Sequence, residues 1–166
     1  MAIVDEVAKA QWSPNSVMKG QLTTAGNEIL TLSFALTFGF LSFLSAVPGT
    51  VAEARVQDLP LGPLLLPKAY ATLALLPLLL YGIAALQRGL ARVMGGVGTG
   101  AGARRGLIWS LMVASPWVLL SGLLSEAQYQ PIRILIGAIG FGIFAVNWII
   151  AIRLNEGALQ PSQTRG

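Results

Sequence analysis

Hydrophobic residues follow one another almost without a break in four long stretches of this 166-residue chain. We place these stretches at residues 27–47, 69–86, 107–124 and 132–152. Each has roughly the length of about 20 residues that a helix needs to cross the hydrocarbon core of a bilayer. Because a backbone in lipid must satisfy its own hydrogen bonds, such stretches form helices. The pattern therefore predicts an all-α, polytopic membrane helical bundle with about four transmembrane helices.

The first 26 residues precede the first span and contain a short amphipathic helix. One face of it consists of Ile3, Val4, Val7, Ala8 and Gln11, all but the last apolar. Two interpretations are open: a solvated helix that packs on the protein's own loops, or a helix on the membrane surface with Trp12 as an interfacial anchor. Ser13 and Pro14 have the order of an N-cap and a first helical residue, so a second helix is expected there. Residues 1–26 are thus predicted to be a cytoplasmic or interfacial helix segment ahead of a membrane domain at 27–153.

Prolines predict where the spans end or bend. Pro48 and Gly49 are expected to end the first span. The segment Leu59–Pro67 holds three prolines, too many for a regular helix interior. It is therefore expected to be an apolar loop that dips into the membrane interface or packs on the span ends, and the sequence leaves open whether it is re-entrant. Pro77 and Pro116 lie inside spans, where they predict kinks.

The fourth span carries small residues at positions suited to close helix packing. They are Gly137, Ala138, Gly140 and Gly142. Small side chains let helix backbones approach each other closely in a membrane, so these positions are candidate helix-packing residues. Asn147 in the same span is a further packing candidate. Its amide could contact a ligand, but an interhelical hydrogen bond is the favoured interpretation.

The segment 87–106 separates the second and third spans and is rich in glycine. It contains no acidic residue and four arginines, namely Arg88, Arg92, Arg104 and Arg105. These arginines are the candidate lipid or partner contacts. They could set the orientation of the spans, attract anionic lipid head groups, or bind carboxylates of a partner through paired hydrogen bonds.

The distribution of basic residues predicts the orientation of the chain. One side of a four-span arrangement carries Lys9, Lys19, Arg88, Arg92, Arg104, Arg105, Arg153 and Arg165, and the other carries Arg55, Lys68 and Arg133. Cytoplasmic loops hold the excess of lysine and arginine. We therefore expect a multi-pass protein of the cell inner membrane with both termini in the cytoplasm.

Composition narrows the possible chemistry. Only 11% of the residues are charged, and the chain contains no cysteine and no histidine. Thiolate chemistry, cysteine metal sites and the commonest general base are therefore excluded. Gly96-x-Gly98-x-x-Ala101 fits a relaxed dinucleotide fingerprint, but that motif requires a preceding strand and here follows a membrane span. We expect no enzyme activity, catalytic residue, metal, cofactor or nucleic-acid partner.

The stretch Leu79–Leu123 resembles the core of bacterial YIP1-family integral membrane proteins. The similarity lies in a helix ending in ARVMGG, the following GxG and GAR, and an aromatic-bearing span interrupted by Ser115-Pro116. A looser similarity covers residues 17–156. The resemblance implies a compact helical membrane domain without known catalytic residues, and it transfers no functional residue to this chain.

Two classes of function remain after these exclusions. The first is a non-enzymatic membrane protein that organises or associates with membrane components, or an accessory subunit of a membrane complex. Its partners would be the lipid bilayer, anionic lipids, other membrane proteins or further copies of the chain. The second is a small transporter or channel, which usually requires ionisable groups inside the membrane. Residues 154–166 have the composition of a flexible C-terminal tail.

Overall fold

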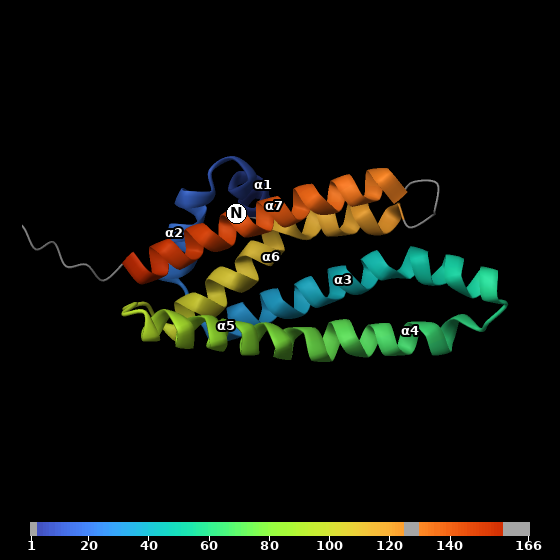
Figure 1. Ribbon diagram of the computed structural model, residues 1–166, viewed down its shortest axis with the longest axis horizontal. Helices are drawn as coiled ribbons and strands as arrows, with labels where there is room; N and C mark the ends of the chain where they lie inside the picture. Colours follow the sequence, from blue (N-terminus) through green and yellow to red (C-terminus); the bar gives the residue numbers. More distant parts are fainter. Residues whose placement is uncertain (1–2, 125–129, 158–166) are drawn as a thin grey trace, which may run out of the picture.

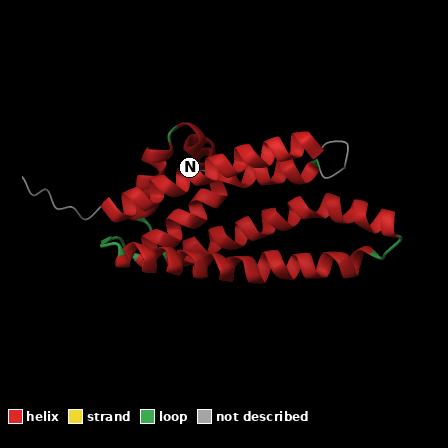
Figure 2. Cartoon of the chain, in the orientation of Figure 1, coloured by secondary structure: helices red, strands yellow, loops and turns green. Residues whose placement is uncertain are grey.

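The computed structural model describes residues 3–124 and 130–157, and its regular structure is entirely helical (Figures 1 and 2). The elements in chain order are α1 (Ile3–Trp12), α2 (Pro14–Thr23), α3 (Glu28–Gln57), α4 (Leu61–Tyr70), the π-helical turn η1 (Ala71–Leu75), α5 (Leu76–Val93), α6 (Gly100–Leu123) and α7 (Gln130–Gly157). The all-α prediction is confirmed. The second helix begins at Pro14, as the Ser13-Pro14 pair predicts.

Four helices are long and apolar enough to cross a membrane: α3, the continuous helix Leu61–Val93, α6 and α7. The predicted four-span membrane protein is thereby supported. Helix α6 is central, because half of its most apolar 18 residues are buried, against 17% in Leu61–Val93 and in α7. The start of α3, the α5–α6 connection and the last turn of α7 lie together, and we call this region the loop end. The α3–α4 turn lies at the opposite end (Figure 1).

The first span does not end at Pro48, as the sequence analysis expects, but continues to Gln57. Pro48 lacks the N–H that would bond the Leu44 carbonyl, and a membrane helix tolerates such a loss inside a span. Close by, the Thr50 hydroxyl bonds the Ala46 carbonyl at 2.8 Å, which is a different carbonyl from the one that Pro48 leaves free. Asp58 then ends the helix in the left-handed conformation, with φ at 51°.

Only Leu59 and Pro60 of the segment Leu59–Pro67 lie outside a helix, so the predicted loop is wrong from Leu61 on. Pro60 is the N-cap of α4, and Pro63 lies in the first turn, where helical N–H groups have no partner in any case. Pro67 lies inside the helix, and the π-helical turn η1 follows it, so the second span begins at Leu61. In η1 the backbone of Thr72 approaches Gly39 of α3 so closely that a Cβ atom on Gly39 would overlap the Thr72 carbonyl oxygen.

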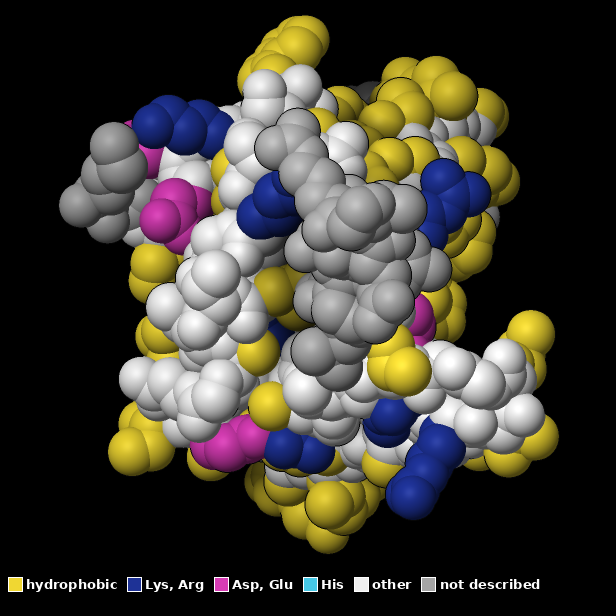
Figure 3. Space-filling view, turned by 90° about the vertical axis from the view of Figure 1, so that its left-hand side faces the viewer, with side chains coloured by type: hydrophobic (Ala, Val, Ile, Leu, Met, Phe, Trp, Pro, Cys, Tyr) yellow, Lys and Arg dark blue, Asp and Glu magenta, His cyan; other side chains and the backbone are white. Residues whose placement is uncertain are grey.

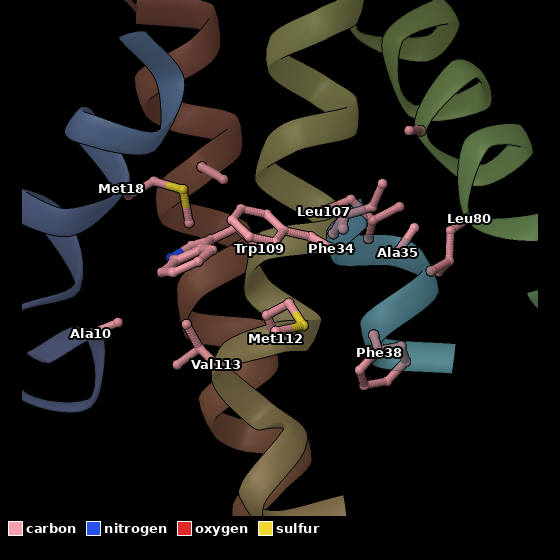
Figure 4. Close-up of a cluster of buried hydrophobic side chains, with 13 residues drawn as sticks. Ala10, Met18, Phe34, Ala35, Phe38, Leu80, Leu107, Trp109, Met112 and Val113 are labelled. Carbon is pink, nitrogen blue, oxygen red and sulfur yellow. The ribbon is translucent and has the colours of Figure 1, made fainter. Parts of the chain in front are cut away.

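The hydrophobic core lies where α6 meets α2 and the first half of α3 (Figure 4). Trp109 of α6 is fully buried in it, beside Met18 of α2. The ring of Phe34 in α3 lies 5.3 Å from the Trp109 ring between centroids. The core therefore joins the N-terminal helices to the membrane bundle.

The N-terminal helix α1 packs on helices rather than on loops. The Gln11 side chain donates to the carbonyl of Val113 in α6 at 2.8 Å. That carbonyl lies next to the proline kink: Pro116 has no N–H for the Met112 carbonyl, which accepts instead from the Ser115 hydroxyl at 2.8 Å. On the outer side of α1, Trp12 is 90% exposed. The helix thus has an inner face on the bundle and an outer apolar side, and whether that side lies on a membrane surface stays a prediction.

Candidate functional site

The glycine-rich segment starts where α5 ends, in a left-handed turn. The N–H of Gly96 bonds the Ala91 carbonyl at 2.7 Å, and the N–H of Gly95 bonds the Arg92 carbonyl at 3.1 Å. This pair of bonds is a Schellman motif, which requires a residue with positive φ. Gly95 meets that requirement with φ at 84°. Glycine is used here because it adopts this conformation without steric cost.

Thr99 begins the next helix. Its hydroxyl accepts from the Gly102 N–H at 2.9 Å, and its carbonyl accepts from the Ala103 N–H at 3.0 Å. Threonine is a favourable N-cap because its side-chain oxygen satisfies one of the free donors at a helix start. The connection between α5 and α6 is thus ordered at both of its ends.

The last turn of α7 holds this connection through Glu156. The carboxylate accepts from the Gly98 N–H at 2.9 Å and from Arg88 Nη1 at 3.3 Å. Arg88 also donates to the Gly96 carbonyl at 3.3 Å. Both side chains of the ion pair are about one-fifth exposed, so the pair is only partly screened by solvent.

Asn155 completes the same contact. Its Oδ1 atom accepts from the Thr99 N–H at 3.3 Å, and its Nδ2 atom donates to the Thr99 carbonyl at 3.2 Å. We refer to Arg88, Gly98, Thr99, Asn155 and Glu156 as the loop–helix cluster.

The glycines of the connection allow α7 to approach. A Cβ atom added to Gly98 would lie 2.5 Å from Asn155 Nδ2 and 2.6 Å from Glu156 Oε1, and one added to Gly102 would overlap the Asn155 side chain. These glycines therefore make room for a helix of the same chain. The formal nucleotide fingerprint follows helix α5 rather than a strand, so its required context is missing here.

Arg104 and Arg105 belong to the first turns of α6 and face inward. Arg104 forms an ion pair with Glu28 at the start of α3, and its guanidinium lies 5.8 Å from the centre of the Tyr81 ring. Arg105 is fully buried. Its Nη2 atom donates to the Thr24 carbonyl at 3.0 Å, and its guanidinium lies 5.1 Å from the centre of the Phe34 ring.

The four predicted arginine contacts are therefore not equivalent. Arg88, Arg104 and Arg105 bind groups within the chain, whereas Arg92 is exposed and forms no hydrogen bond or ion pair with another described residue. Figure 3 shows the loop end, where lysine and arginine side chains appear at several separate places. Contact of these residues with lipid or a partner stays a prediction.

The predicted small-residue face of α7 divides between two environments. A Cβ atom on Gly140 would lie 2.7 Å from the Cβ of Trp117 in α6, so Gly140 is a packing residue. Gly137 and Gly142 have no atom within 4 Å of such a Cβ, and Ala138 is exposed. Asn147 is buried and donates to the Ile143 carbonyl of its own helix at 3.0 Å. The observed bond is thus intrahelical where the sequence analysis favours an interhelical one.

The sequence analysis missed Asn155 and Glu156, which fall in the segment 154–166 that it predicts to be a flexible tail. Helix α7 extends to Gly157, and residues 158–166 lie outside the described residues. A signal was present: Glu156 is the last acidic residue of the chain and shares its predicted side with the arginine-rich segment.

The arrangement pairs and buries charges, and it ties helix ends together. Among residues 3–124 and 130–157, no group of three or more acidic side chains is placed to hold a metal ion. Two nitrogen atoms of Arg105, Nε and Nη1, are buried without a hydrogen-bond partner in the same part of the chain. Arg104 Nε and Trp109 Nε1 are also without a partner among these residues, so Arg105 is the side chain with two such donors.

Comparison with protein-family models, with curated proteins and with solved structures gave no match. The resemblance to the YIP1 family gains no support from these comparisons. The long apolar helices show the coarser class, a multispanning membrane protein in contact with a lipid bilayer.

Proposed function

We propose that this chain is a non-enzymatic multispanning inner-membrane protein that acts by associating with another membrane component, as an accessory subunit does. The supporting observation is the shape and surface of the helical hairpin formed by α3 and α4. No residue of α4 or η1 is buried, and α4 packs mainly on α3 and η1. At the α3–α4 turn, opposite the loop end, the ribbon of this hairpin stands apart from those of α6 and α7 (Figure 1).

The hairpin is longer than a bilayer requires. Helix α3 has 30 residues and the helix Leu61–Val93 has 33. At 1.5 Å per residue they extend about 45 Å and about 50 Å, against about 30 Å of hydrocarbon. Lys68 and Glu53 form an ion pair at 3.0 Å across the hairpin, and Lys68 also donates to the Thr50 hydroxyl at 2.8 Å. A polar group of this kind favours a position near the membrane boundary.

Apolar side chains continue beyond that ion pair toward the turn. The exposed ones are Val56, Leu59, Leu61 and Leu66. Outside the hydrocarbon core such a surface would face water, and exposed apolar patches of this kind are typical of interaction sites. A partner that covers residues 54–66 would remove this surface from water, which supports the accessory role.

Photo-crosslinking in native membranes tests the proposal. A benzophenone amino acid replaces Leu66 in the hairpin or, as the control, Phe141 on α7, which is exposed to a similar extent. We expect a discrete protein adduct from position 66 and no such adduct from position 141. Lipid adducts alone at both positions would contradict the proposal, because they would show that the hairpin surface has no protein partner.

A small transporter or channel is the second candidate, and buried Arg105 favours it. Ionisable residues within membrane helices often mark solute pathways, and Arg105 keeps two nitrogen donors unpaired within the described residues. Anion efflux from proteoliposomes is the test. Efflux that the parent supports and an Arg105→Gln variant abolishes would favour the transporter, whereas no efflux above empty vesicles would exclude anion transport.

The location and the family are part of the same proposal. Both termini are proposed to be cytoplasmic because basic residues are concentrated on the side of the α5–α6 connection. Membership of the YIP1 family is supported by the stretch Leu79–Leu123 alone.

A further inference from the structure

A groove of about 580 Å³ lies between α2 and the last turns of α7, at the loop end. It is lined by Lys19, Leu22, Thr23, Arg153, Leu154 and Gly157. Two of these side chains are basic, two are large and apolar, and none is acidic. The groove is separate from the loop–helix cluster, with which it shares no residue.

The two basic side chains are available to a ligand. Lys19 and Arg153 are exposed, and neither forms a hydrogen bond or an ion pair with another described residue. Arg88 and Arg104, by contrast, are neutralised by Glu156 and Glu28. The groove thus brings together two cations from different helices that have no counter-ion in the described part of the chain.

The apolar part of the groove continues onto the surface of α7. Leu22 and Leu154 line the groove itself. One turn and two turns before Arg153, Ile149 and Val146 are exposed. The exposed apolar surface therefore runs from the cations along a helix that is long and apolar enough to cross the membrane.

We propose that this groove binds one anionic phospholipid from the adjoining leaflet. The phosphate lies between the Lys19 ammonium and the Arg153 guanidinium, and an acyl chain lies along Leu154 and Ile149. A lipid fits better than a soluble anion because the groove couples its two cations to an apolar surface that enters the bilayer. This inference goes beyond the proposed accessory role and does not depend on it.

Native mass spectrometry of the full chain in mild detergent tests the charges. The protein is titrated with phosphatidylglycerol or with phosphatidylcholine. We expect tighter binding of phosphatidylglycerol, and a loss of about fivefold for each cation removed in a Lys19→Gln/Arg153→Gln variant. The control variant Lys9→Gln/Arg92→Gln removes the same charge from exposed residues outside the groove. An equal loss in both variants would indicate a diffuse surface field and would overturn the proposal. Unchanged binding in the groove variant would also overturn it.

A second measurement keeps both cations in place. Because the chain has no native cysteine, a Thr23→Cys variant can carry one fluorophore at the rim of the groove. Val93→Cys, exposed at the end of α5, is the control. In mixed vesicles, bromine atoms on the acyl chains of phosphatidylglycerol should quench the fluorophore at position 23 more strongly than bromine atoms on the acyl chains of phosphatidylcholine. A fluorophore at position 93 should be quenched equally by the two brominated lipids. No preference at position 23 would overturn the proposal.

Discussion

Gly98 donates its backbone N–H to the carboxylate of Glu156, 58 positions later in the chain, at 2.9 Å. The same carboxylate forms the ion pair with Arg88. One side chain in the last turn of α7 therefore joins the end of α5 to the α5–α6 connection. The glycine-rich segment is therefore the surface against which the last turn of α7 packs.

Replacing Gly98 with alanine should destabilise the protein. The added Cβ would displace the ends of the Asn155 and Glu156 side chains and weaken their hydrogen bonds. We expect a loss of about 1–3 kcal/mol, measured as a lower melting temperature in detergent. The matched control is Gly89→Ala in α5, where nothing lies within 4 Å of the new atom. A Gly98→Ala variant that melts at the same temperature as the parent protein would show that the loop–helix cluster contributes no stability.

Gly140 and Gly142 lie two positions apart in α7, but leucine should destabilise the protein only at position 140. Gly140→Leu forces a side chain against Trp117 of α6 and should cost about 1–3 kcal/mol. Gly142→Leu enters open space and should leave the melting temperature unchanged. Destabilisation by Gly142→Leu instead would indicate a contact between copies of the chain at that face.

Lysine should not substitute for Arg105 without a loss of stability, whereas it should substitute for Arg92 without one. A lysine at 105 has to bury an ammonium group with fewer and differently placed donors, because it lacks the planar guanidinium that bonds Thr24 and faces Phe34. We expect Arg105→Lys to lower stability by about 1–3 kcal/mol. Arg92→Lys keeps an exposed charge and should be neutral, as thermal unfolding of the two variants will show. An Arg105→Lys variant as stable as the parent would mean that this arginine serves only to set the orientation of the spans.

The proposed orientation predicts different access to single cysteines. Val97 in the α5–α6 connection and Gln130 at the start of α7 are exposed at opposite ends of the bundle, and neither side chain forms a hydrogen bond or an ion pair with another described residue. An impermeant thiol reagent added to intact cells should label Gln130→Cys, which lies outside the proposed partner surface at residues 54–66, and spare Val97→Cys. Labelling both after permeabilisation is the control. The reverse pattern in intact cells would place the termini outside the cytoplasm.

The prolines show where local sequence rules predict the ends of helices correctly and where they do not. The rule that proline ends a helix failed at Pro48 and in Leu59–Pro67, yet the Ser13-Pro14 start of α2 was predicted. Proline at a first turn costs no hydrogen bond, whereas proline inside a helix costs one that a neighbouring group can replace. Whether such a group is present depends on packing, as with the hydroxyl of Ser115 beside Pro116.

The four arginines show a second limit. Their grouping between two spans was visible in the sequence, but their separate environments were not. Arg105 and Arg92 belong to the same basic segment, and one is buried while the other is exposed. The partners of the buried and paired arginines come from α3, from α7 and from the turn after α2, all distant in sequence.

By itself the sequence determined the all-α membrane class, the four long apolar helices and the absence of cysteine and histidine chemistry, because length and hydrophobicity of each segment are local properties. Tertiary structure alone decided which charges pair, which glycines admit a neighbour and which face of α7 is covered. The contact of Gly98 with Glu156 and that of Gly140 with Trp117 depend on how two helices cross. A crossing depends on the side chains of both helices at once, so no single stretch of sequence specifies it.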